Sequence, residues 1–229
     1  MTLPIFSLPF LVLAEIFNQM AETEIFFLSL SSKKSHKIIK VCRRKDENLS
    51  LTIFDKGTYV SKEVSHEEYR RFLRCKAIKE IYISALAPKN FRFLEKLPVV
   101  ELLCVDNCKW ITIDHLLTME IEALKICSKS NLSNLNINLF LKHWLTGGSP
   151  RLRFFFMQIR NVNLDVIFQD LEDAVEFVER PREFQWRRDW VAKFNEAFDI
   201  TRNDGVTASL VRLNADEPGW TEVTFLVWP

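Results

Sequence analysis

The residues best suited to metal chemistry are cysteines and a histidine in the middle of the chain. Cys104, Cys108, His115 and Cys127 together could be imagined as a zinc site. However, the Cys104-x-x-x-Cys108 pair has no matching second pair, and no closely spaced pair of histidines accompanies it. We therefore interpret these cysteines as buried structural residues, and we expect no metal and no other cofactor.

The remaining residues do not indicate acid–base catalysis or nucleotide binding. His143 precedes Trp144 within an apolar stretch, which is typical of a packed histidine. Adjacent carboxylates such as Glu172 and Asp173 point apart on a helix, so they do not form a catalytic pair. The chain has only five glycines and neither of the glycine motifs that bind nucleotide phosphates. We expect no enzyme; the alternative is a small cytosolic enzyme whose site these motifs do not reveal.

The charge of the chain does not indicate nucleic acid as a partner. The 229 residues include 31 Lys and Arg against 30 Asp and Glu, whereas nonspecific nucleic-acid binding needs a basic excess. A basic run over residues 33–45 fits either a nuclear-localisation or RNA patch or the solvated face of a helix. The run lacks the interleaved aromatic residues that single-strand binding requires, which favours the helix face.

Membrane insertion and secretion are also not expected. The apolar stretch over residues 3–14 is too short to span a membrane and lacks the basic leader of a signal peptide. The five cysteines are an odd number and do not have the regular spacing of a secreted disulfide scaffold. We therefore expect an intracellular protein of the cytoplasm, the nucleus or both.

Residues 1–41 have the pattern of three short helices. The first opens at Leu8-Pro9, the second covers residues 24–30 and the third residues 33–41. The first helix is apolar over more of its surface than one core-facing stripe needs. Its apolar residues are Phe10, Leu11, Val12, Leu13, Ile16, Phe17 and Met20. This surface packs either against the rest of the chain or against a partner protein, because so small a module rarely buries it alone.

A pattern of the form apolar-x-x-apolar-x-apolar recurs along the middle of the chain. Its copies start 22, 21 and 31 residues apart, at Ile78/Ile81/Ile83, Val100/Leu103/Val105, Ile121/Leu124/Ile126 and Leu152/Phe155/Met157. We expect each copy to form a short parallel strand followed by a returning helix. The copies are either irregular leucine-rich repeats or ordinary β-α units of another α/β domain.

Local signals predict the remaining helices, hairpins and strands. Helices are expected over residues 65–73, 135–146 and 164–178. Hairpins are expected around Asp55-Lys56-Gly57 and Asn203-Asp204-Gly205, and a last strand over residues 222–228. The predicted fold class is therefore α+β with an α/β-like core, a leucine-rich-repeat-like β-α part and a C-terminal β-hairpin.

The alternation of strand residues also predicts a second face of the sheet. If Val100, Leu103 and Val105 face the helices, the residues between them face the opposite side. That side would carry Tyr82, Leu102, Cys104, Lys125, Phe154 and Phe156. Several of these residues are apolar, so the face needs either a cover from the same chain or a partner. The cover would come from the hairpin at Asn203-Asp204-Gly205 or from the helix beginning at Leu164, and the partner would be a target protein.

Several segments resemble known modules. Leu8-Pro9-Phe10-Leu11-Val12-Leu13-Ala14-Glu15-Ile16-Phe17, followed by residues 25–35, resembles an F-box, the three-helix module that docks on a Skp-family adaptor of cullin ubiquitin ligases. The stretches from Cys108-Lys109-Trp110-Ile111 to residues 140–152, and from Phe198 to Gly205 with Val227-Trp228, resemble the type-two F-box-associated domain of nematode F-box proteins.

The resemblance implies a substrate-recruiting subunit of a Skp-cullin-F-box ubiquitin ligase. It implies an F-box over residues 1–45 and an F-box-associated substrate-binding domain over 46–229. The F-box residues expected to contact the adaptor are Leu8, Pro9, Val12, Leu13 and Ile16, the same surface that exceeds the needs of one core. The target is an unknown protein. An F-box protein that acts as a scaffold outside ubiquitination is the alternative.

Overall fold

The computed structural model describes most of the chain from residue 79 onward and parts of the N-terminal region. The described residues are 10–20, 28, 50–53, 66–74, 79–83, 87–106, 108–127, 130–187, 190–214 and 219–229. Of the second and third predicted F-box helices, only Leu28 lies within the described residues. The first predicted helix is confirmed as α1 (Phe10–Gln19).

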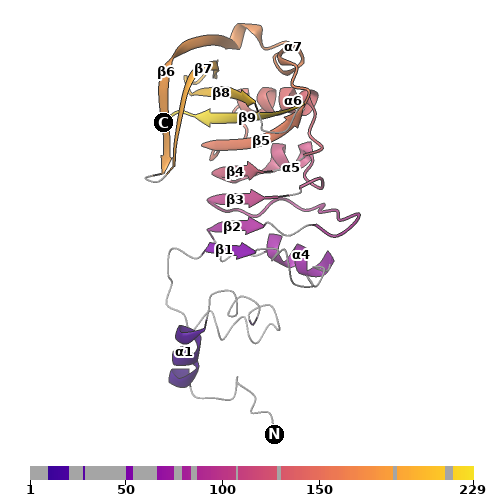
Figure 1. Ribbon diagram of the computed structural model, residues 1–229, viewed down its shortest axis with the longest axis vertical. Helices are drawn as coiled ribbons and strands as arrows, with labels where there is room; N and C mark the ends of the chain where they lie inside the picture. The colour runs from indigo at the N-terminus through magenta and orange to yellow at the C-terminus, as the bar shows by residue number, and fades with distance from the viewer. Residues whose placement is uncertain are drawn as a thin grey trace.

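The centre of the fold is a mixed nine-stranded sheet with the order β1-β2-β3-β4-β5-β9-β8-β7-β6 (Figure 1). One half is parallel and contains β1 (Ser50–Ile53), β2 (Glu80–Ile83), β3 (Leu102–Val105), β4 (Ala123–Ile126) and β5 (Phe154–Arg160). The other half is antiparallel and contains β9 (Trp220–Val227), β8 (Thr207–Asn214), β7 (Trp190–Thr201) and β6 (Val175–Arg187). The chain is therefore α+β, as predicted.

The recurring apolar pattern is confirmed as a set of adjacent parallel strands. Ile81, Leu103, Leu124 and Phe155 are register partners across the sheet, and Ile83, Val105, Ile126 and Met157 form the next such row. All eight residues are almost fully buried in one core. Equivalent positions of the four copies lie side by side because each copy provides one strand and the four strands are paired in register.

The intervals between these strands are less regular than predicted. Helices α4 (His66–Leu73), α5 (Ile113–Thr118) and α6 (Asn134–Leu145) lie before β2, before β4 and before β5. Between β2 and β3, residues 87–101 form no helix. That stretch contains Pro88 and Pro98, and it covers the sheet in extended form with the buried side chains of Phe91, Phe93 and Leu97. The prediction of a helix in each repeat is therefore wrong here.

The predicted helix over 164–178 is also wrong. The chain forms only α7 (Leu164–Ile167) and the 3-10 turn η2 (Glu172–Ala174) before β6 begins at Val175. Asn138 of α6 is buried and donates from Nδ2 to the carbonyl oxygens of Ile167 at 2.9 Å and Gln169 at 2.8 Å. These bonds hold residues 167–169 in a turn. Asp170 has a φ of 60°, outside the right-handed helical region, so no single helix runs from α7 to residue 178.

The two predicted hairpins have different outcomes. Asn203-Asp204-Gly205 joins β7 to β8 as predicted, with Gly205 at φ +87° in the left-handed region that glycine favours. The strand at residue 50 exists, but as β1 it pairs in parallel with β2. The rest of that hairpin, residues 54–65, lies outside the described part. The predicted last strand is confirmed as β9.

The end of α6 depends on close contact between a glycine and a histidine ring. The backbone N–H of Gly148 donates to the carbonyl oxygen of His143 at 3.0 Å. A Cβ atom added at Gly148 would lie 2.1 Å from Nε2 of that ring. His143 therefore fills the space beside a residue that has no side chain, as expected of a packing histidine, and its buried Nε2 atom has no hydrogen-bond partner among the described residues.

We predict that Gly148→Ala lowers the free energy of unfolding by about 1–3 kcal/mol, because the new methyl group overlaps the His143 ring, which then has to shift. Urea unfolding followed by circular dichroism measures the loss. The double variant Gly148→Ala/His143→Ala removes the clash and should recover part of the stability. Equal losses in the single and the double variant would contradict this explanation.

Candidate functional site

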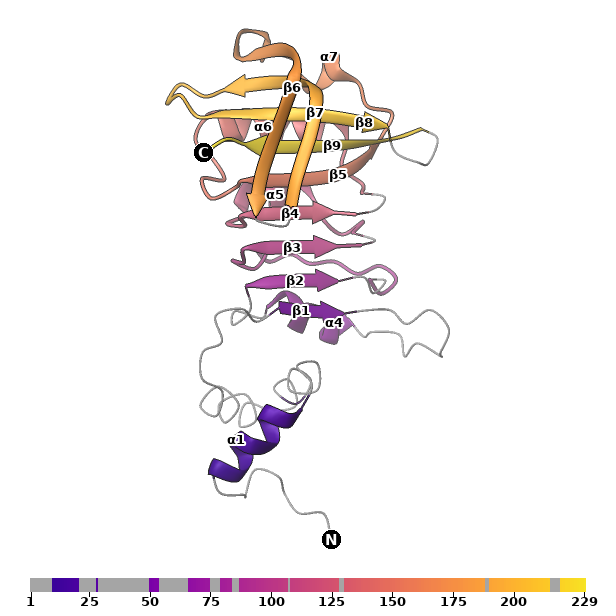
Figure 2. The same ribbon diagram turned by 60° about the vertical axis from the view of Figure 1, so that its left-hand side comes forward.

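Strands β6 and β7 form a long ribbon that crosses the face of the sheet opposite the helices (Figure 2). Only residues 198–201 of β7 pair with β8, so the rest of the ribbon is free to leave the sheet. The register shifts between Glu179 and Arg182, around Pro181, which cannot donate to the ladder. This irregularity lies where the ribbon turns over the sheet.

The ribbon buries one half of the predicted second face. The apolar cluster beneath it comprises Leu102, Ala123, Phe154, Phe184, Phe194, Ala197, Val211 and Leu226. Phe154 is 3% exposed and packs against Trp186, at 5.9 Å between ring centroids, and Trp190, at 4.5 Å. Leu102 and Phe154 are therefore core residues, which corrects their prediction as target-binding residues. Of the expected covers, the helix from Leu164 ends at Ile167 and contributes no residue to this cluster. The hairpin at residues 203–205 does contribute, through its arm β7, which carries Phe194 and Ala197 and pairs with β6.

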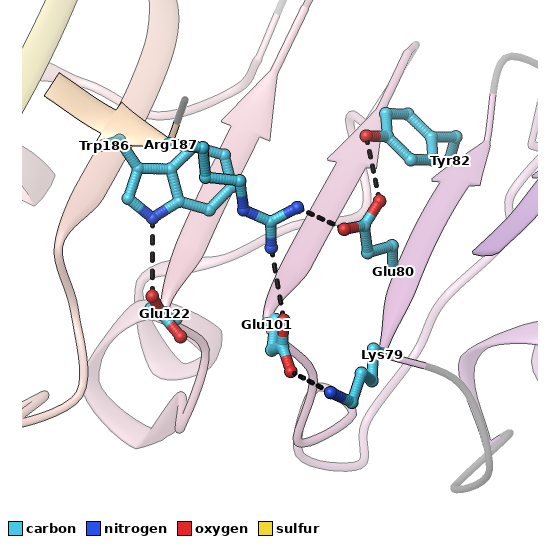
Figure 3. A network of polar contacts seen from close by, with 7 residues as sticks. All are labelled: Lys79, Glu80, Tyr82, Glu101, Glu122, Trp186 and Arg187. Atoms are coloured by element: carbon cyan, nitrogen blue, oxygen red, sulfur yellow. Dashed lines mark hydrogen bonds and ion pairs between the residues drawn. The ribbon is translucent and has the colours of Figure 1, made fainter. Parts of the chain in front are cut away.

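An arginine at the tip of the ribbon bridges the first residues of neighbouring strands (Figure 3). The Arg187 guanidinium pairs with Glu80 of β2 and, at 3.3 Å from Nη2 to Oε2, with Glu101 just before β3. Next to it, Trp186 Nε1 donates to Glu122 Oε1 at 3.4 Å, just before β4. The guanidinium also lies 4.2 Å from the centroid of the Trp186 ring. We call Trp186 and Arg187 with these three glutamates the ribbon latch.

The latch extends to two more side chains. Tyr82 donates from its hydroxyl to Glu80 Oε2 at 3.2 Å, and Lys79 Nζ lies 3.1 Å from Glu101 Oε1 (Figure 3). Partial burial, then the nearby Glu80 carboxylate, raises the pKa of Tyr82 to about 12. Tyr82 is therefore a neutral hydrogen-bond donor at physiological pH, and it connects the latch to the uncovered part of the face.

A second polar network fixes the base of the ribbon. Arg182 of β6 binds both carboxylate oxygens of Asp199 at 2.6 and 2.7 Å, and Ser209 donates to Asp199 at 2.5 Å. Trp228 Nε1 donates to Ser209 Oγ at 2.8 Å, and the Arg182 guanidinium lies 4.3 Å from its ring centroid. These mostly buried contacts join β6, β7, β8 and the residue after β9, and so hold the ribbon against the sheet.

The other half of the face remains accessible, and we call it the open half. Tyr82, Cys104, Lys125 and Phe156 are register partners across β2 to β5, and all four are partly exposed. Two positions further along the strands, the same face carries Cys127, Gln158, Glu222 and Leu213. Leu213 is 51% exposed. The structure therefore brings these four predicted target-binding residues together on one accessible surface.

The open half combines apolar and charged groups. Lys125 Nζ lies 5.4 Å from the centroid of the Phe156 ring, and Gln158 Nε2 donates to Glu222 Oε1 at 3.2 Å. Aromatic side chains are enriched at protein–protein interfaces, so Tyr82 and Phe156 are the residues of this surface best suited to contact a partner. No strand of the chain covers this half in the described residues.

The predicted adaptor-binding residues of α1 differ in exposure. Val12 is 44% exposed and Ile16 is partly exposed, whereas Leu13 is 4% exposed and Phe17 is fully buried. Leu8 and Pro9 lie outside the described residues. Leu13 and Phe17 belong to neither core cluster of the sheet. Of the three members of the predicted set that the structure describes, Val12 and Ile16 are accessible and Leu13 is not.

The hypothetical zinc ligands do not converge. Cys104 and Cys127 are neighbours, but His115 instead stacks on Phe93 at 6.0 Å, and Cys108 is fully buried in the core. Burial holds the pKa of His115 below its ordinary value. In the described part of the chain, no three His, Cys, Asp or Glu side chains are placed to hold a metal ion. None of the helices described there is long and apolar enough to cross a membrane.

Two family models match the chain: residues 5–47 match the F-box domain, and residues 82–157 match the family described as F-box associated. The chain thus carries an F-box and an F-box-associated domain. The second match runs from Tyr82 in β2 to Met157 in β5, so it covers most of the parallel half of the sheet.

A relative in Caenorhabditis elegans, the Skn-1 dependent zygotic transcript 15 protein, is 26% identical over 113 residues. The aligned region is 48% of this F-box protein and 31% of that relative, so the chain spans about a third of the curated protein it matches. No solved structure matches the chain.

The ribbon residues Trp186, Arg187 and Trp190 are the functional residues that the sequence predictions missed. Their signal is present, because Phe184 and Trp186 alternate with polar residues as they do in a half-buried strand.

We predict that Arg187→Gln loosens the ribbon tip without unfolding the sheet. Removing a charged hydrogen-bond partner of two carboxylates costs about 1.5–3 kcal/mol locally. Amide hydrogen exchange over residues 183–187 and 190–194 should accelerate about tenfold or more, whereas exchange in β3 and β4 stays unchanged. Arg212→Gln, which changes an exposed arginine of β8, is the control. Unchanged exchange at the ribbon tip would contradict a role for the latch.

Phe154 and Phe156 provide a matched test of the covered and open halves. We expect Phe154→Ala to lower the free energy of unfolding by about 3–5 kcal/mol, because it leaves a cavity beneath the ribbon. Phe156→Ala should cost only about 1 kcal/mol, because this ring is partly exposed. Urea unfolding of both variants measures the difference. A core-sized loss for Phe156→Ala would show that the open half is internal packing.

Proposed function

We propose that this protein is a substrate-recruiting subunit of a Skp-cullin-F-box ubiquitin ligase. The observation that carries the proposal is the succession, within one chain, of an F-box match at residues 5–47 and an F-box-associated match at 82–157. In this function the F-box binds a Skp-family adaptor, and through it a cullin, while the second domain binds a target protein. Ubiquitin transfer takes place elsewhere in the assembly.

The adaptor contact is proposed for the accessible side of α1. Val12 and Ile16 are four residues apart, so their side chains lie on the same side of the helix. Helices commonly bind an apolar groove with anchors at such spacing. Leu8 and Pro9 complete the proposed contact. Leu13 supports the helix from within, because it is almost fully buried in the chain.

The target contact is proposed for the open half of the sheet, at Tyr82, Cys104, Lys125 and Phe156. The ribbon latch keeps this surface in one shape, because it fixes the neighbouring covered half. A target held there would be close to the ligase, which raises its effective concentration for ubiquitin transfer. In this function the protein contributes binding and orientation, and ubiquitin is not transferred through its own residues.

Co-expression with a Skp-family adaptor tests the proposed function. We expect the two proteins to co-purify, and we expect the single changes Val12→Asp and Ile16→Asp each to weaken binding strongly, because a charge in a desolvated apolar groove costs several kcal/mol. Both changed positions are accessible, so circular dichroism should show an unchanged fold. Wild-type affinity in both variants would overturn the F-box contact.

A second measurement separates recruitment of a target from scaffolding. Phe156→Asp should leave adaptor binding unchanged, because Phe156 lies in the sheet domain. It should abolish adaptor-dependent ubiquitination of any protein that the wild type presents to a reconstituted ligase. Adaptor binding without ubiquitination of any bound protein would instead indicate a scaffold that acts outside ubiquitination.

A further inference from the structure

Two thiols meet in the middle of the open half. Cys104 Sγ lies 3.3 Å from Cys127 Sγ. Cys104 is in β3 and Cys127 directly follows β4, and the two lie on the same face because Lys125 is the register partner of Cys104. Both side chains are partly exposed, so small molecules can reach them.

The two thiols are not equivalent. The Cys104 and Cys127 sulfur atoms are in hydrogen-bond contact, in which either can donate. This contact, together with the positive charge of Lys125, lowers the pKa of Cys104, whereas the same contact raises the pKa of Cys127. Since the thiolate is the nucleophile, Cys104 is the more reactive of the two.

Cys108 provides an internal comparison. It lies four residues after Cys104 but is fully buried in the core on the other side of the sheet. Burial raises its pKa to about 12. Cys108 therefore has a thiol that solvent cannot reach and whose pKa is raised and not lowered.

We propose that Cys104 and Cys127 form a peroxide-oxidisable dithiol site in which Cys104 is the attacking thiol and Cys127 the resolving one. The Cys104 thiolate attacks one oxygen of a hydroperoxide, the O–O bond breaks, and an alcohol, or water from hydrogen peroxide, leaves after protonation. Cys104 is then a sulfenic acid. The Cys127 sulfur displaces its hydroxyl, which leaves as water with the Cys127 proton, and a disulfide remains.

The electrons balance in this sequence. Two thiols lose two electrons and two protons, and the hydroperoxide is reduced to an alcohol and water. A dithiol reductant reverses the reaction by thiol exchange. The present separation of 3.3 Å has to shorten to the 2.03–2.05 Å of a disulfide bond, a movement that the end of β4 can supply because Cys127 lies just beyond the strand.

The position of the pair gives the oxidation a consequence for recognition. A bond between the two sulfur atoms would draw the end of β4 towards β3 beside Lys125 and Phe156, and so would change the shape of the open half. This consequence rests on the proposed function, whereas the disulfide itself forms or fails to form whatever the surface binds.

Peptide mapping of the full-length protein after brief treatment with hydrogen peroxide tests the site. Trypsin and an endoprotease that cleaves before aspartate together separate Cys104, in residues 97–105, from Cys108, in residues 106–109, and from Cys127, in residues 126–129. We expect residues 97–105 to become linked to residues 126–129 with the loss of two hydrogen atoms, and dithiothreitol to remove the link. Absence of this link, or a link through Cys108 instead, would overturn the proposal.

Single serine variants test the order of attack. In Cys127→Ser, the sulfenic acid on Cys104 has no resolving thiol and should be trapped by dimedone. In the wild type, brief treatment with limiting iodoacetamide should alkylate Cys104 before Cys127, because the neighbouring sulfur raises the pKa of Cys127 while Cys104 is present. Cys108→Ser is the matched control and should form the link as the wild type does. Equal alkylation of Cys104 and Cys127 in the wild type would contradict the assigned roles.

Discussion

A sheet whose strands are apolar on both faces has to be covered on both faces, and the rest of this structure follows from that constraint. The helices and the extended segment at residues 87–101 cover one face. No further helix is present in the described residues to cover the other face, and the chain covers it with a two-stranded ribbon instead. The ribbon reaches only the half of the face near the start of the parallel strands. The boundary between the covered and open halves therefore decides which residues are core and which can bind.

The latch gives the ribbon a defined position. Apolar contacts between Phe154 and the two tryptophans provide attraction but little direction, whereas the guanidinium of Arg187 has to meet two carboxylates at fixed places. Taking these charges out of water costs free energy, which the paired hydrogen bonds offset. Their contribution is thus to select one register of the ribbon over others. A surface held in this way can present the same side chains each time it meets a partner.

The two modules use apolar surface for different purposes. In the sheet domain nearly all large apolar residues of β2 to β5 are buried, apart from the partly exposed Tyr82 and Phe156. In α1, Val12 is exposed although Leu13 beside it is buried. A helix that binds in a groove needs buried residues that hold it in place and exposed residues that contact the partner. Leu13 and Val12 have these two environments, in agreement with the F-box match. Neither module needs a catalytic group for a role in recruitment.

The amino-acid sequence alone determined the strand positions of the parallel half, the turn at Asn203-Asp204-Gly205 and the F-box and F-box-associated resemblances. These depend on local patterns, because strand alternation and turn residues act within a few positions of the chain. It also placed Tyr82, Cys104, Lys125 and Phe156 on one face.

Only the tertiary structure decided that Leu102 and Phe154, on that same face, are core residues. Their cover comes from β6 and β7, more than twenty residues away in sequence, and it depends on where Asn138 turns the chain and where Arg187 finds its carboxylates. Such contacts leave no periodic signal in the sequence, because each joins residues whose separation is set by the fold and not by the geometry of one helix or strand.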